Sequence, residues 1–177
     1  MRIIAGALGG RIFESPRTHR THPMSDRVRG ALFNTLGDIT GLTVLDAYAG
    51  TGALSFEAIS RGAISALAID DDKDAYLCVV DNVEKLNLKE QVTVLRKNIS
   101  GWSRNNQHKK FDVVLADPPY DDIMPNVIER LFGHLKPAGL LVLSWPGSEP
   151  TRQFDNVTVV THKSYGDAQL VFYRKIA

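Results

Sequence analysis

The sequence is poor in cysteine and in long apolar runs, and each absence excludes a class of protein. Cys78 is the only cysteine, so the chain has no internal disulfide and no cysteine-rich metal site. We expect Cys78 to be a small buried apolar residue. No stretch approaches the apolar length that spans a bilayer, and the opening residues, MRIIAGALGG, do not follow the pattern of a secretory signal. These features favour a cytoplasmic protein without a metal.

The overall charge is nearly balanced, but its distribution is uneven. Hydrophobic residues make up 44% of the 177 residues and charged residues 23%, as in ordinary globular domains. We predict a single domain over 1–177, with a basic extension over 1–25 and a core over 26–177. Six arginines against two acids give residues 1–29 a local charge of +4, whereas the whole chain carries +1. This basic arm, with His19 and His22 alongside, is either a solvated face or a phosphate-binding surface. Its arginines are Arg2, Arg11, Arg17, Arg20, Arg27 and Arg29.

Short apolar strands alternate with helices from residue 42 onward. Such strands, rich in Val, Leu and Ile, are typical of a parallel sheet covered on both faces. The last two segments alternate around Gly166–Asp167, which indicates an antiparallel hairpin. The predicted fold class is therefore α/β, a Rossmann-like, mostly parallel sheet with a C-terminal hairpin. We predict strands over 42–47, 65–70, 91–95, 111–117, 139–144, 156–165 and 168–176, and helices over 54–62, 73–87 and 123–134.

The segment before this sheet has a different pattern. Glycines 6, 9 and 10 followed by RIFES (11–15) predict a short β-hairpin with a glycine turn. A polar loop leads to a predicted helix over 25–39, for which Ser25 or Asp26 is the candidate N-cap. The basic extension would thus be a hairpin followed by a helix.

A glycine loop joins the strand 42–47 to the helix that follows it. Gly50 and Gly52 allow a tight turn and a close approach of the backbone to a ligand. In open α/β sheets, ligands bind beyond the carboxyl ends of the strands. Asp70 ends the next strand, where it can accept hydrogen bonds from ribose hydroxyls. These features favour a pocket for a nucleoside-bearing cofactor over a turn that serves packing alone.

Two residues of this loop region distinguish among such cofactors. A dinucleotide-binding turn reads G-x-G-x-x-G, but Ser55 replaces the third glycine, which weakens a dehydrogenase reading. Asp46 would repel a pyrophosphate, whereas it suits a cation such as an amine or a sulfonium. S-adenosylmethionine carries both cations and a ribose, and we therefore predict it as the cofactor.

Two consecutive prolines follow the predicted strand 111–117. They fix φ and lack N–H groups, so the Asp117 side chain and the Pro118 carbonyl can be held as acceptors that face one point. Two such acceptors suit an –NH₂ group, and they favour a pyramidal nitrogen whose lone pair faces an electrophilic methyl. Tyr120 offers a ring for base stacking, worth about 1–3 kcal/mol. A D-P-P turn alone is also common in ordinary loops, but its position after the glycine loop predicts methyl transfer by positioning and electrostatics. The predicted catalytic segment is Asp117, Pro118, Pro119 and Tyr120.

These motifs resemble those of the RsmD-like family of small-subunit ribosomal RNA guanine-N2 methyltransferases. The similarity covers nearly the whole chain. The resemblance implies the class I methyltransferase fold and methyl transfer from S-adenosylmethionine to the N2 amine of a guanine. It rests on MRIIAG with GGRI, DRVRGALFNTL (26–36), VLDAYAGTGALSFEAISRGA (44–63), DPPY (117–120) and YGD (165–167).

The resemblance also implies roles for individual residues. Asp117, Pro118 and Tyr120 would hold the guanine, and the RNA would run along Arg11, Arg27 and Arg29. We expect a monomer that acts on ribosomal RNA, either bare or within a small subunit or an assembly intermediate. The implied cofactor-binding residues are Asp46, Gly50, Thr51, Gly52, Asp70 and Asn98. The chain departs from the family pattern at His22, Met24, Gly30 and Trp145, which bears on RNA contact more than on the reaction.

Two other functions remain open. An amine methyltransferase acting on adenine N6 or on a protein glutamine would use the same pair of acceptors, although Asp117 mildly favours guanine and the basic arm favours nucleic acid. A binding module that kept RNA affinity and lost catalysis is the other alternative. The intact set of Asp46, Gly50, Gly52, Asp70 and DPPY argues against it.

Overall fold

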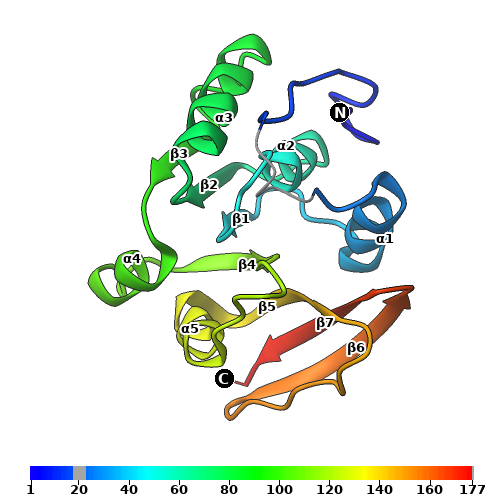
Figure 1. Ribbon diagram of the computed structural model, residues 1–177, viewed down its shortest axis with the longest axis vertical. Helices are drawn as coiled ribbons and strands as arrows, with labels where there is room; N and C mark the ends of the chain where they lie inside the picture. The colour runs from blue at the N-terminus through cyan, green and yellow to red at the C-terminus, as the bar shows by residue number, and fades with distance from the viewer. Residues whose placement is uncertain (18–22, 177) are drawn as a thin grey trace.

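The computed structural model describes residues 1–17 and 23–176, and these residues form one seven-stranded sheet (Figure 1). The strand order is β3-β2-β1-β4-β5-β7-β6. Neighbours among β1 to β5 run parallel, and β7 is antiparallel to both β5 and β6, which confirms the predicted fold class. The strands are β1 (Thr43–Asp46), β2 (Ser65–Asp70), β3 (Val92–Arg96), β4 (Phe111–Ala116), β5 (Leu135–Pro146), β6 (Val157–Tyr165) and β7 (Ala168–Lys175).

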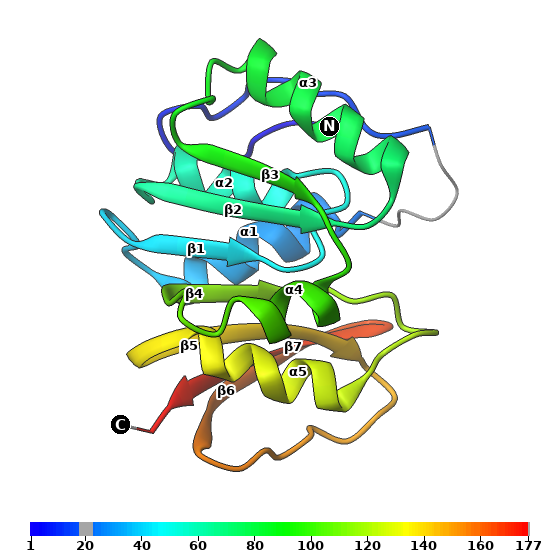
Figure 2. The same cartoon turned by 90° about the vertical axis from the view of Figure 1, so that its left-hand side faces the viewer.

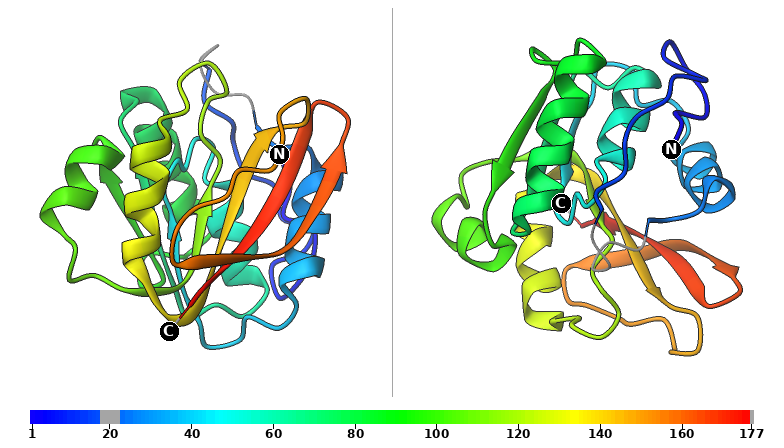
Figure 3. Two further views of the ribbon diagram at one scale, coloured as in Figure 1. Left: turned by 90° about the horizontal axis from the view of Figure 1, so that it is seen from below. Right: turned by 45° about the horizontal axis from the view of Figure 1, so that its top comes forward.

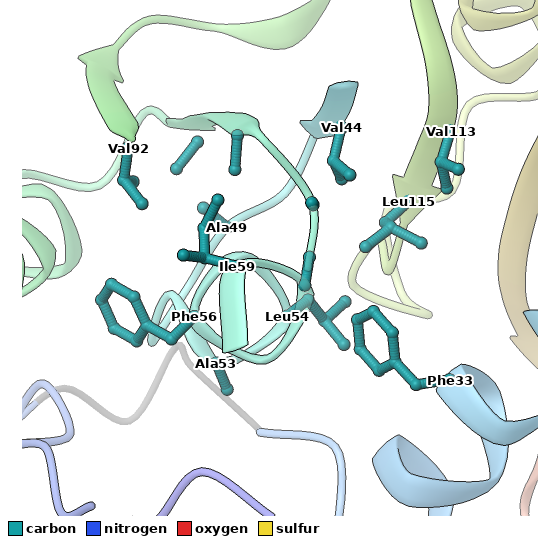
Figure 4. Packing of buried hydrophobic residues seen from close by; sticks show 14 of the residues in the cluster. Phe33, Val44, Ala49, Ala53, Leu54, Phe56, Ile59, Val92, Val113 and Leu115 are labelled. Carbon is teal, nitrogen blue, oxygen red and sulfur yellow. The ribbon is translucent and has the colours of Figure 1, made fainter. Parts of the chain in front are cut away.

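Helices cover both faces of the sheet (Figure 2). One apolar cluster joins one face to α1, α2 and α3, and Figure 4 shows Phe33 and Leu54 packed beside Val44 and Leu115. A second cluster joins the other face to α4, α5 and the 3₁₀ turn η1. Successive strand residues point to opposite faces, so the near-continuous apolar strands supply both clusters. The helical elements are α1 (Asp26–Leu36), α2 (Ala53–Ser60), α3 (Lys73–Lys85), α4 (Ile99–Asn105), α5 (Pro125–Leu131) and η1 (Phe132–His134).

Several predicted boundaries need correction. α1 begins where expected, with the Ser25 side chain accepting from Val28 N, but it ends before residue 39 because Gly37 takes a positive φ of 77°. α4 was not predicted at all, and β5 is longer than the predicted 139–144. Cys78 is half-buried on α3 rather than fully buried.

The N-terminal segment forms a short, irregular hairpin, with one antiparallel bridge between Arg2 and Ile12 and backbone hydrogen bonds that join Met1 to Phe13 and Ile3 to Arg11. At its turn the backbone also bonds to side chains of α2. Glu57 accepts from the N–H groups of Ile4 and Ala5, and the Ser60 hydroxyl accepts from Leu8. The predicted short hairpin is therefore present, but its pairing ends near Ile3 because the next N–H groups donate to α2. His19, Arg20 and His22 of the basic extension lie outside the described residues.

No helix within residues 1–17 and 23–176 is both long and apolar enough to cross a membrane.

Candidate active site

The order of the strands reverses between β1 and β4, and polar side chains gather beyond the ends of these strands. Asp46 pairs with Leu115, and Asp117 lies two residues further along the chain. Ala116 pairs with Leu143, so the next residues, Asp117 and Ser144, are neighbours. Strand alternation puts Asp46, Asp117 and Ser144 on the face covered by α1 and α2. The sheet therefore brings together the predicted cofactor-binding acid Asp46 and the predicted amine acceptor Asp117.

Asp46 is a buried carboxylate with one free oxygen. It is 1% exposed, its Oδ2 accepts from the Ser55 hydroxyl at 2.7 Å, and its Oδ1 finds no hydrogen-bond partner within the described part of the chain. Burial raises its pKa to about 7, and the charges of Asp117 and Asp70 act in the same direction. A buried, half-satisfied carboxylate is unfavourable by itself. The site thus fits a cationic ligand group.

The glycine loop takes the conformation that its glycines allow. Gly50 and Gly52 have φ values of 52° and 79°. A Cβ at residue 52 would lie 2.9 Å from the Phe56 ring, so only glycine fits this turn. Thr51 is buried and its Oγ1 accepts from Ala53 N, so its side chain serves the start of α2. Gly50 is half-buried, whereas Thr51 and Gly52 are buried, so contact between the loop backbone and a ligand stays a prediction.

Asp70 is the last residue of β2, and Asn98 follows β3. Both side chains accept hydrogen bonds from backbone N–H groups. Asp70 accepts from Gly50 N at 2.8 Å and from Asp72 N at 2.9 Å. Burial raises the pKa of Asp70. Asn98 is the N-cap of α4 and accepts from Gly101 N at 3.2 Å. Each of these oxygens has a second lone pair, so binding of ribose or adenine by these residues stays a prediction.

The D-P-P-Y segment leaves β4 at the same edge. Pro118 is buried, whereas Pro119 and Tyr120 are exposed. The Tyr120 hydroxyl lies 2.7 Å from the Ser144 hydroxyl, while 41% of Tyr120 is exposed. Burial raises the pKa of Asp117 to about 6, and a hydrogen bond from Ser144 opposes this shift. A carboxylate and an accessible aromatic ring are thus held beside each other.

The three predicted RNA-contacting arginines have three different environments. Arg27 is exposed, and its guanidinium lies 5.9 Å from the centre of the Tyr165 ring. Tyr165 pairs with Ala168, and Ala168 pairs with Pro146 at the end of β5. The contact between Arg27 and Tyr165 therefore lies at the carboxyl ends of the parallel strands, where Asp117 also lies. Figure 3 shows α1 beside the β6–β7 hairpin. Arg27 is therefore the arginine that borders the site.

Arg11 and Arg29 are not beside the site. Arg11 donates to the carbonyls of Lys85 and Leu86 at the end of α3, which lies at the opposite edge of the sheet. Arg29 is 0% exposed, and it bonds to Asp26 Oδ1 at 3.0 Å and lies 3.8 Å from Glu57 Oε2. The expectation that Arg29 contacts RNA is wrong, because its side chain is inside the protein.

Sequence reasoning missed Glu57, which is fully buried on α2. It binds two backbone N–H groups, pairs with Arg61 Nε at 2.8 Å and faces Arg29. The only available signal was an acid inside an apolar helix four residues before an arginine. Among residues 1–17 and 23–176 no group of three His, Cys, Asp or Glu side chains could hold a metal ion.

Comparison with known sequences gives a consistent result. A family described as "Conserved hypothetical protein 95" matches residues 1–174. "Ribosomal RNA small subunit methyltransferase D" of Haemophilus influenzae is 32% identical over 180 residues, which cover 98% of this chain and 92% of the relative. The protein of the same name from Escherichia coli is 33% identical over 121 residues, which cover 68% of this chain and 60% of that relative.

Comparison with solved structures agrees. "Putative methyltransferase yhhF from Escherichia coli" has a TM-score of 0.87 and 28% identity, and the match covers 100% of this chain and 98% of that one. The "putative methylase HI0767 from Haemophilus influenzae" has a TM-score of 0.81 and 30% identity, covering 99% and 98%. The fold is that of class I methyltransferases. The chain therefore belongs to the family described as "Conserved hypothetical protein 95" and is an RsmD-like methyltransferase.

Proposed function

We propose that this protein methylates the N2 amine of a guanine in small-subunit ribosomal RNA, with S-adenosylmethionine as the methyl donor. One observation carries the proposal: a buried carboxylate with a free oxygen, Asp46, lies on the same sheet face and edge as the amine acceptor Asp117 and the accessible ring of Tyr120. The names of the Haemophilus and Escherichia coli relatives support the choice of RNA. We further propose that it works as a monomer in the cytoplasm, on a small subunit or an assembly intermediate.

The cofactor side of the site is formed by the ends of β1 and β2. When bound, S-adenosylmethionine supplies an electrophilic methyl group on a sulfonium. The free Oδ1 of Asp46 would attract the cationic methionine end, and Gly50 and Gly52 let the loop backbone lie close to it. Asp70 would accept from the ribose hydroxyls, and Asn98 from the adenine amine.

The acceptor side is formed by the segment after β4. The Asp117 carboxylate and the Pro118 carbonyl would accept the two amine hydrogens, which directs the nitrogen lone pair to the methyl. Asp117 can also hold the proton that the amine loses, since its pKa is raised to about 6. Tyr120 would stack on the base. A guanine paired in a helix cannot reach these groups, so the target should be splayed out of its helix.

Labelled cofactor tests the proposal directly. The protein would be incubated with naked small-subunit RNA, small subunits, DNA and a glutamine-containing ribosomal protein. Digestion and mass spectrometry should then reveal N2-methylguanosine in one of the RNA samples. Label in N6-methyladenosine or in protein would replace this proposal with the amine-methyltransferase alternative.

Cofactor binding should depend on the ionisation of Asp46. Its pKa of about 7 in the free protein means that the carboxyl is largely protonated in mild acid. A cation favours the ionised form, so binding should release a proton below this pKa, and affinity should rise by up to about tenfold per pH unit towards it. Calorimetry in buffers of different ionisation enthalpy measures both effects.

Asp46→Asn provides the control for this dependence, because an amide has no proton to lose. Its affinity should be lower and nearly constant between about pH 6 and pH 8. An unaltered pH profile in this variant would assign the proton to another group.

Charge reversal at Arg27 should weaken RNA binding, most strongly at low salt. Arg27 is exposed at the edge that holds Asp117, so it can neutralise a phosphate. In Arg27→Glu, the slope of log K against log salt should fall by about 1. Lys89→Glu makes the same charge change before β3, at the opposite edge, and should leave the slope unchanged. Equal effects of the two variants would mean that only net charge matters.

A further inference from the structure

Ser144 is a polar residue at the end of the apolar stretch Leu140–Leu143 on β5, and it is only 4% exposed. The β4–β5 register runs through Ala116 and Leu143, so the next pair is Asp117 with Ser144. The Ser144 hydroxyl lies 2.7 Å from the Tyr120 hydroxyl. The buried Ser144 hydroxyl is thus in contact with the Tyr120 hydroxyl, and Ser144 is the cross-strand neighbour of Asp117.

The chemistry of these three groups defines the order of their hydrogen bonds. A hydroxyl has one hydrogen and two lone pairs, whereas an ionised carboxylate only accepts. In a bridge between these groups, the hydrogen of Ser144 therefore goes to Asp117, its cross-strand neighbour on the same face of the sheet. The Ser144 oxygen then accepts from the Tyr120 hydroxyl. The resulting chain runs from Tyr120 through Ser144 to Asp117, and each bond strengthens the next.

We propose that Ser144 is a positioning residue for methyl transfer, whose hydroxyl joins Tyr120 to Asp117 and holds the stacking ring and the amine acceptor at one fixed spacing. The inference rests on the proposed function, in which a base lies on Tyr120 while its amine donates to Asp117.

A fixed spacing matters because a planar base has its amine in the plane of its ring. Tyr120 sets the height of that plane, and Asp117 must meet the amine within it. Tyr120 follows the end of β4 in a turn, is 41% exposed, and is tied to the sheet through its hydroxyl. Loss of the tie would leave the ring free to rotate about its side-chain bonds.

Four variants test the bridge, using the whole protein and small-subunit RNA. Ser144→Ala removes the bridging hydroxyl, whereas Ser144→Thr keeps a hydroxyl in a residue suited to a strand. Tyr120→Phe removes the hydroxyl at the other end of the bridge. The fourth variant combines Ser144→Ala with Tyr120→Phe. Ser144→Ala should lower kcat/KM by roughly tenfold, as expected for loss of a hydrogen bond to a charged group, and it should move the acid limb of the pH profile upward. Ser144→Thr should restore most of both. The affinity for S-adenosylmethionine should stay unchanged in all four.

The double variant distinguishes a bridge from two separate roles. If Ser144 and Tyr120 act through one chain, the combined loss should be clearly smaller than the product of the single losses. Independent, multiplicative losses would overturn the proposal, as would a Ser144→Ala enzyme with wild-type kcat/KM and pH profile.

A second readout does not depend on turnover. The carboxyl ¹³C shift of Asp117, followed against pH in the cofactor-free protein, should titrate at higher pH in Ser144→Ala than in the wild type. An unchanged titration would overturn the bridge even in an active enzyme. If instead the wild type methylates no guanine while Asp117 titrates as expected, the proposed function fails and the bridge remains.

Discussion

Asp117→Ala should lower turnover on small-subunit RNA by about 10²- to 10³-fold, the usual effect of removing one preorganised group that stabilises developing charge. Asp117 supplies the side-chain acceptor for the amine and a place for its proton, and it is partly buried. It lies beyond β4, whereas the cofactor residues end β1 and β2. The affinity for S-adenosylmethionine should therefore change little. Single-turnover kinetics and calorimetry measure the two quantities separately.

Two matched variants sharpen this prediction. Asp117→Asn keeps an acceptor oxygen but cannot hold a proton, so its activity should lie between those of wild type and Asp117→Ala. Asp121→Ala removes an exposed acid from the same loop and should have almost no effect. A strong loss of cofactor binding in Asp117→Ala would show that the residue serves the cofactor instead.

Glu57→Ala should lower the free energy of unfolding by about 3–5 kcal/mol, the cost of removing one partner from a buried ion pair. Glu57 is fully buried, and it compensates the charge of the fully buried Arg29 as well as binding Arg61. Its loss would leave Arg29 with Asp26 as its remaining carboxylate partner in the described residues. It would also leave the N–H groups of Ile4 and Ala5 without their acceptor. Urea unfolding measures the change.

The control for Glu57 is an acid with an exposed partner. Glu84 pairs with Lys89 at 3.0 Å, and both side chains are two-thirds exposed. Glu84→Ala should therefore cost at most about 1 kcal/mol. Replacing Glu57 and Arg29 together by methionine should recover part of the stability, because no lone charge is then buried. Similar small losses in Glu57→Ala and Glu84→Ala would contradict the buried network.

The parallel part of the sheet could be predicted from the sequence because its strands contain short apolar runs, and the C-terminal hairpin because its two strands alternate around Gly166–Asp167. The ends of β1 and β4 could also be predicted, since Asp46 and Asp117 each directly follow a short apolar run. α4 was missed because ISGWSRN contains glycine and serine and has little intrinsic helix preference. It is stabilised by its Asn98 cap and by burial of Ile99 and Trp102 against α5.

Arg29 shows the limit of counting charges along a chain. It is two residues from the exposed Arg27, and local sequence does not distinguish them. The partner that decides its burial, Glu57, is 28 residues away and comes near only once α2 packs on α1. The proposed role of Ser144 could not be predicted from the sequence for the same reason, because it depends on the register between β4 and β5.

The free oxygen of Asp46 has a consequence for inhibitor design. A neutral adenosine analogue would leave the buried Oδ1 of Asp46 without a hydrogen-bond or charge partner. The carboxylate could then lose its unfavourable charge only by taking up a proton. Uncharged compounds should thus be selected best in screens run in mild acid, and a basic nitrogen placed at the same point should gain potency as the assay is made more alkaline.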